Sequence, residues 1–321
     1  MAKIIDTLLL LALPASGKSE VRKYLASLDP TTCREELHLG PTVQLDDYPY
    51  VHLMHRIDDE LKKAGGSYVF YGGPDQPFRA PVFWGTLTAL LNEDYDDLVH
   101  QRTVAPVSAA HHLFARLDRA TVTAGGDALL DSVPADVLGR VADALEAECR
   151  AQLDEKQAAY VPSLTGHTVV IEAARGGADG STMPLTGYNG YQYMLSALSD
   201  AILDKASILY VWVTPEESRR KNTERTDPND PGSILHHGVP MSVMLGEYGC
   251  DDIDHLIQAS GQPDTVRVEA RDKVWHVPIG RFDNRVDKTS FLRTDKADWS
   301  PAQVKAIHEG LAGALKRIAE R

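Results

Sequence analysis

The chain has 321 residues, of which 43% are hydrophobic and 25% charged, as in an ordinary globular protein. This length suffices for one large α/β domain or two smaller ones, and it excludes a disulfide mini-scaffold, a collagen or a disordered chain. The 33 Lys and Arg against 46 Asp and Glu give a formal net charge of −13. Such a field repels a nucleic-acid backbone, which argues against general DNA or RNA binding but not against a small anionic ligand in a local positive pocket.

The cysteines and the N-terminus indicate the cellular location. Cys33, Cys149 and Cys250 are far apart and form no Cys-x-x-Cys pair, as expected in a reducing cytosol. The apolar run at 8–13 resembles the core of a secretory signal, but Asp6 interrupts its approach and the run is short. No other stretch reaches the about 20 apolar residues that span a bilayer. We therefore expect a cytoplasmic protein without a membrane partner.

Apolar and amphipathic segments alternate along most of the chain. Short apolar runs predict buried strands at 7–13, 42–45, 168–171, 208–213 and 274–279, with 67–71 as a further strand candidate. Amphipathic patterns predict helices at 18–28, 50–63, 191–203, 215–225 and, at the C-terminus, 300–321. Strands that alternate with helices predict a mostly parallel sheet with helices on both faces.

Residues 72–165 break this alternation. They contain helical patterns near 83–91, 107–120 and 134–157, separated by Pro and Gly. We interpret them as a helical insertion beside the sheet. The expected organisation is a first part of the α/β core at 1–71, the insertion at 72–165, and a second part of the core, with a lid and a terminal helix, at 166–321.

The strongest functional motif follows the first predicted strand. Residues 12–19 read Ala-Leu-Pro-Ala-Ser-Gly-Lys-Ser and match the phosphate-binding pattern GxxxxGK[ST], except that Ala12 replaces the first Gly. Gly17 allows backbone N–H groups to approach phosphate oxygens, and the N-terminus of the following helix favours negative charge. Lys18 is placed to reach the β and γ phosphates, and the Ser19 hydroxyl to ligate Mg²⁺.

This segment resembles the loop of P-loop kinases, the group that includes nucleoside, nucleotide and other small-metabolite kinases. Its Leu-Pro-Ala-Ser-Gly-Lys is similar to the Leu-Pro-Gly-Ser-Gly-Lys of adenylate-kinase-like enzymes. The resemblance implies an α/β P-loop NTPase fold, a three-layer sandwich around a mostly parallel sheet, here with a helical insertion. It also implies ATP, Mg²⁺ and a small-molecule acceptor. The residues expected to hold the nucleotide are Leu13, Pro14, Ala15, Ser16, Gly17, Lys18, Ser19 and Glu20.

Acidic residues follow two other predicted strands. Asp46 and Asp47 lie at the strand end, the edge where open α/β sheets bind ligands. A similar Asp-Asp-Tyr stretch faces the acceptor hydroxyl in uridine-kinase-like enzymes, which implies that Asp46 or Asp47 orients the hydroxyl and accepts its proton. The pair could instead cap the next helix. Glu172 resembles a Walker B acid that supports Mg²⁺, or it is a structural acid at a strand edge.

The helix at 215–225 resembles the lid helix of P-loop kinases. By this resemblance Arg219 and Arg225 close over the transferred phosphoryl group, where their charge stabilises its oxygens. Residues 227–232 then form a loop. The alternative is a solvated helix whose cations are balanced by its own glutamates.

Three further residues are candidate ligand contacts. Arg175 lies close behind Glu172 in the sequence and could reach a phosphate or an acidic substrate group. Arg79 lies among aromatic residues that line an acceptor pocket or pack in the core. Asn284 follows a late strand and resembles an adenine-contacting residue, or it stabilises its own turn.

Together these patterns predict an ATP-dependent kinase that phosphorylates a hydroxyl or phosphate of a small metabolite, with a nucleoside or nucleotide as the first candidate. Two alternatives stay open. One is a nucleotide-gated ATPase or regulator without an acceptor, in which hydrolysis drives a conformational switch. The other is a kinase of RNA ends, against which the acidic net charge argues.

Overall fold

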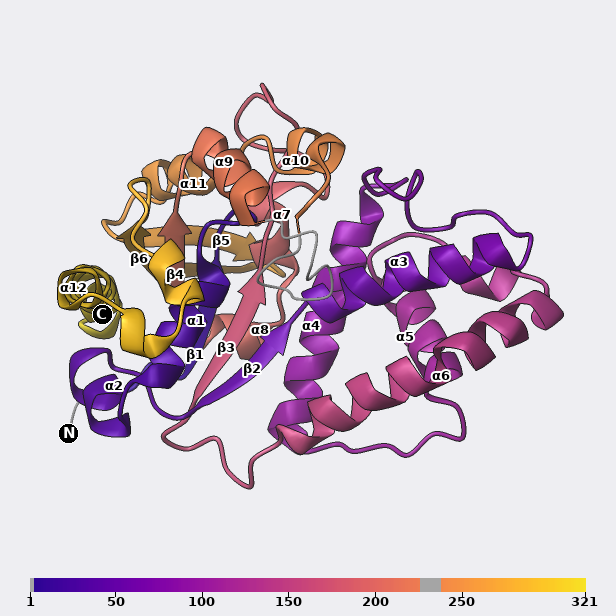
Figure 1. Cartoon of the computed structure of the whole chain (residues 1–321), viewed down its shortest axis with the longest axis horizontal. Helices are drawn as coiled ribbons and strands as arrows, with labels where there is room; N and C mark the ends of the chain where they lie inside the picture. Colours follow the sequence, from indigo (N-terminus) through magenta and orange to yellow (C-terminus); the bar gives the residue numbers. More distant parts are fainter. Residues whose placement is uncertain (1–2, 226–237) are drawn as a thin grey trace.

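A computed structural model describes residues 3–225 and 238–321, without the side chain of Arg225. The described chain forms an α/β fold around a six-stranded sheet (Figure 1). The strands are β1 (Thr7–Leu11), β2 (Thr42–Asp46), β3 (Thr168–Ala173), β4 (Ala206–Trp212), β5 (Thr265–Ala270) and β6 (Lys273–Asp283). Their order is β2-β3-β1-β4-β6-β5, and every pair is parallel except β5 with β6. The predicted mostly parallel sheet is therefore confirmed.

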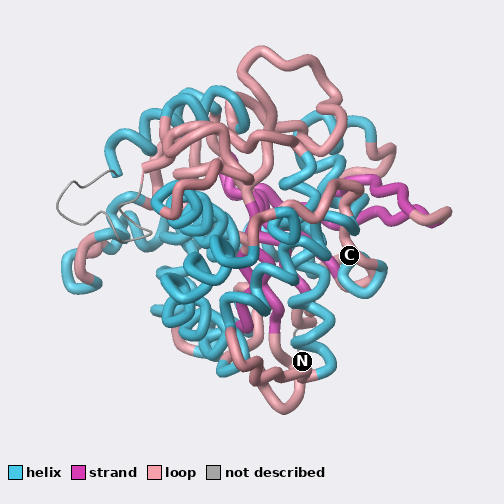
Figure 2. The backbone as a smooth tube through the Cα atoms, turned by 90° about the vertical axis from the view of Figure 1, so that its right-hand side faces the viewer, coloured by secondary structure: helices cyan, strands magenta, loops and turns pink. Residues whose placement is uncertain are grey.

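Helices cover both faces of the sheet, as the unbroken apolar runs of β1 and β3 predict. One face packs against α1 (Lys18–Ser27) and α12 (Pro301–Ala319). The other packs against α4 (Val82–His100), α7 (Gly190–Ala197), α8 (Asp200–Leu203) and α11 (Ile253–Ala259). Figure 2 shows most of the strand segments at the centre with helices around them, and a strand hairpin that extends to one edge.

A third apolar core lies beside the sheet, where the helical insertion was expected. It joins α3 (Tyr48–Lys63), α5 (Ala109–Thr123) and α6 (Ala135–Ala158) to the first half of α4. Phe83 and Leu87 of α4 face this core, whereas Leu91 and Leu98 face the sheet. The predicted insertion thus shares α4 with the sheet and completes its bundle with α3, which precedes residue 72.

One buried carboxylate connects the four helices of the bundle. Asp94 of α4 accepts hydrogen bonds from Tyr50 Oη at 2.6 Å, Arg116 Nη2 at 2.6 Å and Lys156 Nζ at 2.5 Å. Although burial opposes it, the charges of Arg116 and Lys156 hold the pKa of Asp94 below its usual value. Because Tyr50 belongs to α3, this network fixes the helix that starts directly after Asp47.

The predicted strand at 67–71 is wrong. The N–H groups of Val69, Phe70 and Tyr71 donate to the Asp58 carboxylate instead of to a neighbouring strand. Within the described chain the segment contributes only an isolated bridge between Tyr71 and Phe78. The backbone N–H groups of this apolar run are therefore satisfied by a buried carboxylate and not by a neighbouring strand.

The predicted helix at 191–203 is interrupted between α7 and α8. Ser199 N donates to Asn92 Oδ1, and the Ser199 hydroxyl caps α8. Among the described strands and α-helices, those outside the predicted ones are β5, α2 (Pro30–Glu36), α10 (Met241–Glu247) and α11. The predicted helix at 215–225 is present as α9 (Pro215–Arg225), and the predicted loop at 227–232 lies outside the described residues. None of the described helices is long and apolar enough to cross a membrane.

The close approach of α12 to β6 gives a stability prediction. A Cβ on Gly280 of β6 would lie 2.2 Å from the Ala314 carbonyl oxygen of α12, whereas nothing lies within 4 Å of one on Gly313. Gly280→Ala should therefore lower the free energy of unfolding by about 1–3 kcal/mol. Gly313→Ala, on the exposed side of the same helix, should raise it by about 0.5–1 kcal/mol. Urea denaturation of both variants tests the packing, and equal effects would contradict it.

Candidate functional site

The loop between β1 and α1 lies at the carboxyl end of a central strand. Gly17 precedes α1 with φ of +103°, and a Cβ there would lie 2.5 Å from Thr289 Oγ1, so the site requires glycine. Ala15 also has a positive φ, of 54°. Ala12 has no positive φ, and its buried methyl packs between the sheet and α1. Alanine can therefore replace the first glycine of the motif without backbone strain.

Side chains hold two carbonyl groups of the first half of this loop. Lys18 Nζ donates to the Ala12 carbonyl at 3.3 Å, across the loop. The buried Ser218 hydroxyl of α9 donates to the Pro14 carbonyl at 2.7 Å. The lid helix of the prediction is thus attached directly to the loop. Ser218 is a residue that the motif alone does not point to.

Asn284 holds the second half of the loop. Its Nδ2 donates to the Ser16 carbonyl at 2.7 Å and to Thr289 Oγ1 at 2.9 Å, and its Oδ1 accepts from Lys288 N. Because the side chain is fully buried and engaged on both atoms, it supports the loop. The predicted adenine contact gains no support from this position. The Ser16 hydroxyl is buried and has no hydrogen-bond partner in the structure.

The remaining residues of the predicted nucleotide set have different surroundings. Leu13 is fully buried in the core of the helical bundle. Glu20 is buried and accepts a hydrogen bond from Arg293 Nε at 2.8 Å, so it anchors α1. Ser19 lies in the first turn of α1, half-buried. Lys18 and Ser19 thus both lie in the first turn of α1, directly after Gly17.

The structure brings two of the predicted acids together. Asp46 and Glu172 are register partners on the directly paired strands β2 and β3. Arg22 of α1 lies between them, with Nη1 at 3.0 Å from Glu172 Oε2 and 3.5 Å from Asp46 Oδ2. Arg22 was not among the predicted site residues, although it lies four residues after Lys18 on the same side of the helix.

The environment of Asp46 favours proton exchange near neutral pH. Burial, together with the carboxylates of Glu172 and Asp47, raises the pKa of Asp46 to about 7. Its Oδ1 also accepts from the N–H of Tyr48, the first residue of α3, at 2.8 Å, whereas Asp47, the N-cap residue, makes no side-chain capping hydrogen bond. Asp46 therefore has both a fixed orientation and a pKa suited to a general base.

Asp47 is occupied differently. Its Oδ2 accepts a hydrogen bond from Arg175 Nη1, and both side chains are buried. The Asp47 side chain is 9% exposed, against 19% for that of Asp46. Of the two predicted acids, Asp46 is therefore the better placed to receive a proton from a ligand.

The charges of α9 are largely paired. Arg219 lies 3.4 Å from Glu216 and 3.8 Å from Asp179, and its side chain is 20% exposed. Arg220 pairs with Glu217 and Glu224. This pairing matches the alternative of a self-balanced charged helix. The Arg225 side chain lies outside the described residues, so its lid role stays a prediction.

Arg79 does not join the other predicted residues. Its guanidinium is exposed and donates to the Tyr68 carbonyl within its own loop. The neighbouring aromatic rings stack in the core, with 4.6 Å between the centroids of Tyr71 and Phe78 and 4.9 Å between those of Phe78 and Trp84. The packing interpretation of this cluster is therefore favoured over an acceptor pocket.

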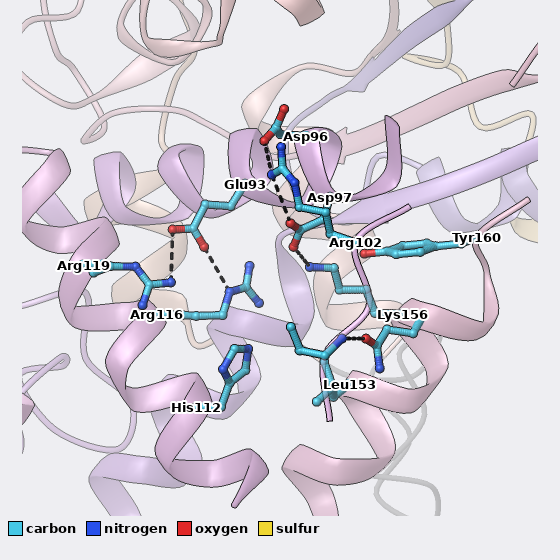
Figure 3. Close-up of a pocket in the computed structure, with 12 residues that line it drawn as sticks. Glu93, Asp96, Asp97, Arg102, His112, Arg116, Arg119, Leu153, Lys156 and Tyr160 are labelled. Carbon is cyan, nitrogen blue, oxygen red and sulfur yellow. Dashed lines mark hydrogen bonds and ion pairs between the residues drawn. The ribbon is translucent and has the colours of Figure 1, made fainter. Parts of the chain in front are cut away.

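Two cavities adjoin the helical bundle. One, of about 540 Å³, extends from Asp46 and Arg22 along β2 to α5 and α6. The other, of about 330 Å³, lies between α4, α5 and α6 (Figure 3). Each Arg and Lys that lines it forms an ion pair with a carboxylate; these are Arg102, Arg116, Arg119 and Lys156. This second cavity therefore offers no unpaired Arg or Lys for an anion.

No family model, curated protein or solved structure matches this chain. The geometry that bears on function is therefore that of the loop and of the neighbouring acids Asp46 and Glu172.

The pKa of Asp46 gives a testable pH dependence. Because this pKa is higher in the folded than in the unfolded chain, folding takes up a proton between about pH 4 and 7, and stability falls as pH rises through that window. Asp46→Asn removes this loss. The Tm of this variant minus the Tm of the parent should therefore increase from pH 5 to pH 8. The increase should be roughly 2–4 °C for each kcal/mol of unfolding free energy that the parent loses over this range. The exposed Asp136→Asn is the control, and a Tm difference that does not change with pH would contradict the shift.

Proposed function

We propose that this protein is a P-loop kinase that uses ATP and Mg²⁺ to phosphorylate a hydroxyl or phosphate group of a small metabolite. The observation that carries the proposal is a single juxtaposition. The loop with the GKS motif follows β1, and Asp46 and Glu172 lie at the ends of β2 and β3, at the same carboxyl edge of the parallel sheet. Ligands of open α/β sheets bind at this edge, where neighbouring connections diverge. Here the chain leaves β1 and β4 toward opposite edges.

The loop fits a polyphosphate. The positive φ angles at Ala15 and Gly17 turn the backbone over the start of α1, where the helix dipole favours anions. The buried Ser16 hydroxyl without a partner is a further donor in the same loop. The Lys18 ammonium donates a hydrogen bond to the Ala12 carbonyl across the loop. With a nucleotide bound, it would donate to phosphate oxygens instead.

The available oxygen ligands suit Mg²⁺. No group of three or more His, Cys, Asp or Glu able to hold a metal occurs among the described residues, and Mg²⁺ in kinase sites uses few protein ligands besides water and phosphate. Ser19 and Glu172 would supply those ligands. When bound, the ion would neutralise charge that develops on the phosphoryl oxygens. Arg22 at 3.0 Å orients the Glu172 carboxylate.

Asp46 supplies the general base of the proposed reaction. With a pKa of about 7 it is partly ionised at neutral pH and can accept the proton of an attacking hydroxyl. Arg22 and the Tyr48 N–H fix its two oxygens, so the proton acceptor is oriented before the acceptor molecule binds. The adjoining 540 Å³ cavity is large enough for a small metabolite.

A transfer assay tests the proposal. Labelled γ-phosphate from ATP with Mg²⁺ should enter one member of a pooled set of hydroxyl-bearing and phosphorylated metabolites. Lys18→Ala should lower kcat/KM for transfer by about 10²–10³-fold, because one cation at the phosphates is lost. Asp46→Asn should lower kcat by about 10²–10⁴-fold, the usual contribution of a general base. Asp136→Asn, on an exposed helix face, should leave transfer unchanged.

The two alternative functions give different results in this assay. A nucleotide-gated ATPase releases the label only as inorganic phosphate and is insensitive to Asp46→Asn. A kinase of RNA ends labels an added oligonucleotide and loses activity steeply with salt. Either outcome would overturn the small-metabolite proposal.

A further inference from the structure

Arg175 is the most deeply buried arginine of the described residues. It follows β3, three residues after Glu172, and is 1% exposed. Nη1 donates to Asp47 and, at 2.8 Å, to the Ala174 carbonyl. The guanidinium lies over the Trp84 ring, 5.0 Å from its centroid. One end of the guanidinium is thus fixed by an ion pair, a carbonyl and an aromatic face.

The other edge of the same guanidinium has no partner. Nε and Nη2 of Arg175 are both buried, and neither has a hydrogen-bond partner in the structure. These two nitrogens form one side of the guanidinium fork, whose parallel N–H groups match the two oxygens of a carboxylate or phosphate. Leaving buried donors of a charged group unpaired is costly, more so than for a neutral group. The two buried donors therefore match a ligand that has two acceptor oxygens.

The surrounding charges leave this edge available to an anion. Among the described residues, Asp47 is the one carboxylate that forms an ion pair with Arg175. The other nearby acid is Glu247, whose Oε1 accepts from Phe78 N at 3.1 Å. Burial raises the pKa of Glu247 to about 7, so this group is partly neutral at physiological pH and repels an arriving anion less than an ionised carboxylate would.

We propose that Arg175 binds an anionic group, a carboxylate or phosphate, of the phosphoryl acceptor through its Nε and Nη2 edge. This inference builds on the proposed kinase function and specifies the acceptor. The acceptor is a small molecule that carries both the reacting hydroxyl and a fixed anion. Asp46 and Asp47 are adjacent in the chain, so the base that receives the proton and the ion pair that orients Arg175 lie at the end of the same strand. Arg175 is then a specificity-determining residue.

Calorimetric titration with inorganic phosphate tests the anion site separately from catalysis. Arg175→Lys keeps a cation for Asp47 but loses the bidentate edge, so it should weaken one phosphate-binding event by about 10- to 100-fold. Lys18→Ala should instead weaken phosphate binding at the loop, which distinguishes the two sources of affinity. Phosphate binding that is the same in Arg175→Lys and in the parent would overturn the proposal.

A second variant covers the case in which Arg175→Lys does not fold. Asp47→Asn keeps an oxygen acceptor for Nη1 and removes the competing negative charge. Phosphate should then bind to the Arg175 edge several-fold more tightly, and unchanged or weaker binding would overturn the proposal.

The transfer assay supplies the third readout, with glycerate and glycerol 3-phosphate as anionic probes and glycerol as the uncharged one. Arg175→Lys should raise KM for an anionic acceptor by about 10- to 100-fold while kcat changes little. If transfer occurs but prefers glycerol and ignores Arg175→Lys, the anion site fails and the kinase function stands. If phosphate binding depends on Arg175 but no acceptor is labelled, the kinase function fails, and with it the assignment of this anion to an acceptor.

Discussion

The shape of the loop between β1 and α1 depends on a contact behind it. Asn284 and Thr289 occupy the space beside Gly17, and Asn284 donates to the Ser16 carbonyl. Because Asn284 N also bonds to the Trp212 carbonyl at the end of β4, the loop is connected to two strands besides its own. A side chain larger than hydrogen at position 17 would displace this support. The glycine of the GKS motif is thus required by packing as well as by its φ angle.

The carboxyl edge of the sheet holds two acid–arginine pairs that differ in burial. Asp46 shares Arg22 with Glu172, and its side chain remains partly exposed. Asp47 is paired with the fully buried Arg175. Burial makes ionisation of Asp46 costly, whereas Asp47 has a cation in direct contact. Two adjacent aspartates therefore have different capacities, one to exchange a proton and the other to hold an arginine in place.

The parts of this site that could be predicted were those set by local pattern. The apolar runs of β1 and β3 and the GKS motif follow from residue type and spacing, which is why the central strands and the loop were expected where they occur. The juxtaposition of Asp46 with Glu172 depends on strand register, and the role of Arg22 depends on how α1 crosses that edge. Neither is encoded in a window of sequence.

The wrong strand at 67–71 has a similar physical cause. A strand and a buried loop can share the same apolar, aromatic composition, and what separates them is the partner of the backbone N–H groups. Here that partner is Asp58, on a helix that the pattern places correctly but whose buried acid carries no local signal. Asn284 differs from Asp58 in this respect. Its role in stabilising its own turn was one of the alternatives that the local sequence predicted.

The helical bundle has a direct mechanical relation to the site. Helix α3 begins immediately after Asp47 and is tied through Tyr50 to Asp94, and Arg116 and Lys156 meet at the same carboxylate. A shift of this network would move the start of α3 and, with it, the Tyr48 N–H that orients Asp46. The bundle therefore positions the proposed base from one side while α1 does so from the other through Arg22. The larger cavity lies between these two supports, so the elements that orient Asp46 also form the walls of the cavity beside it.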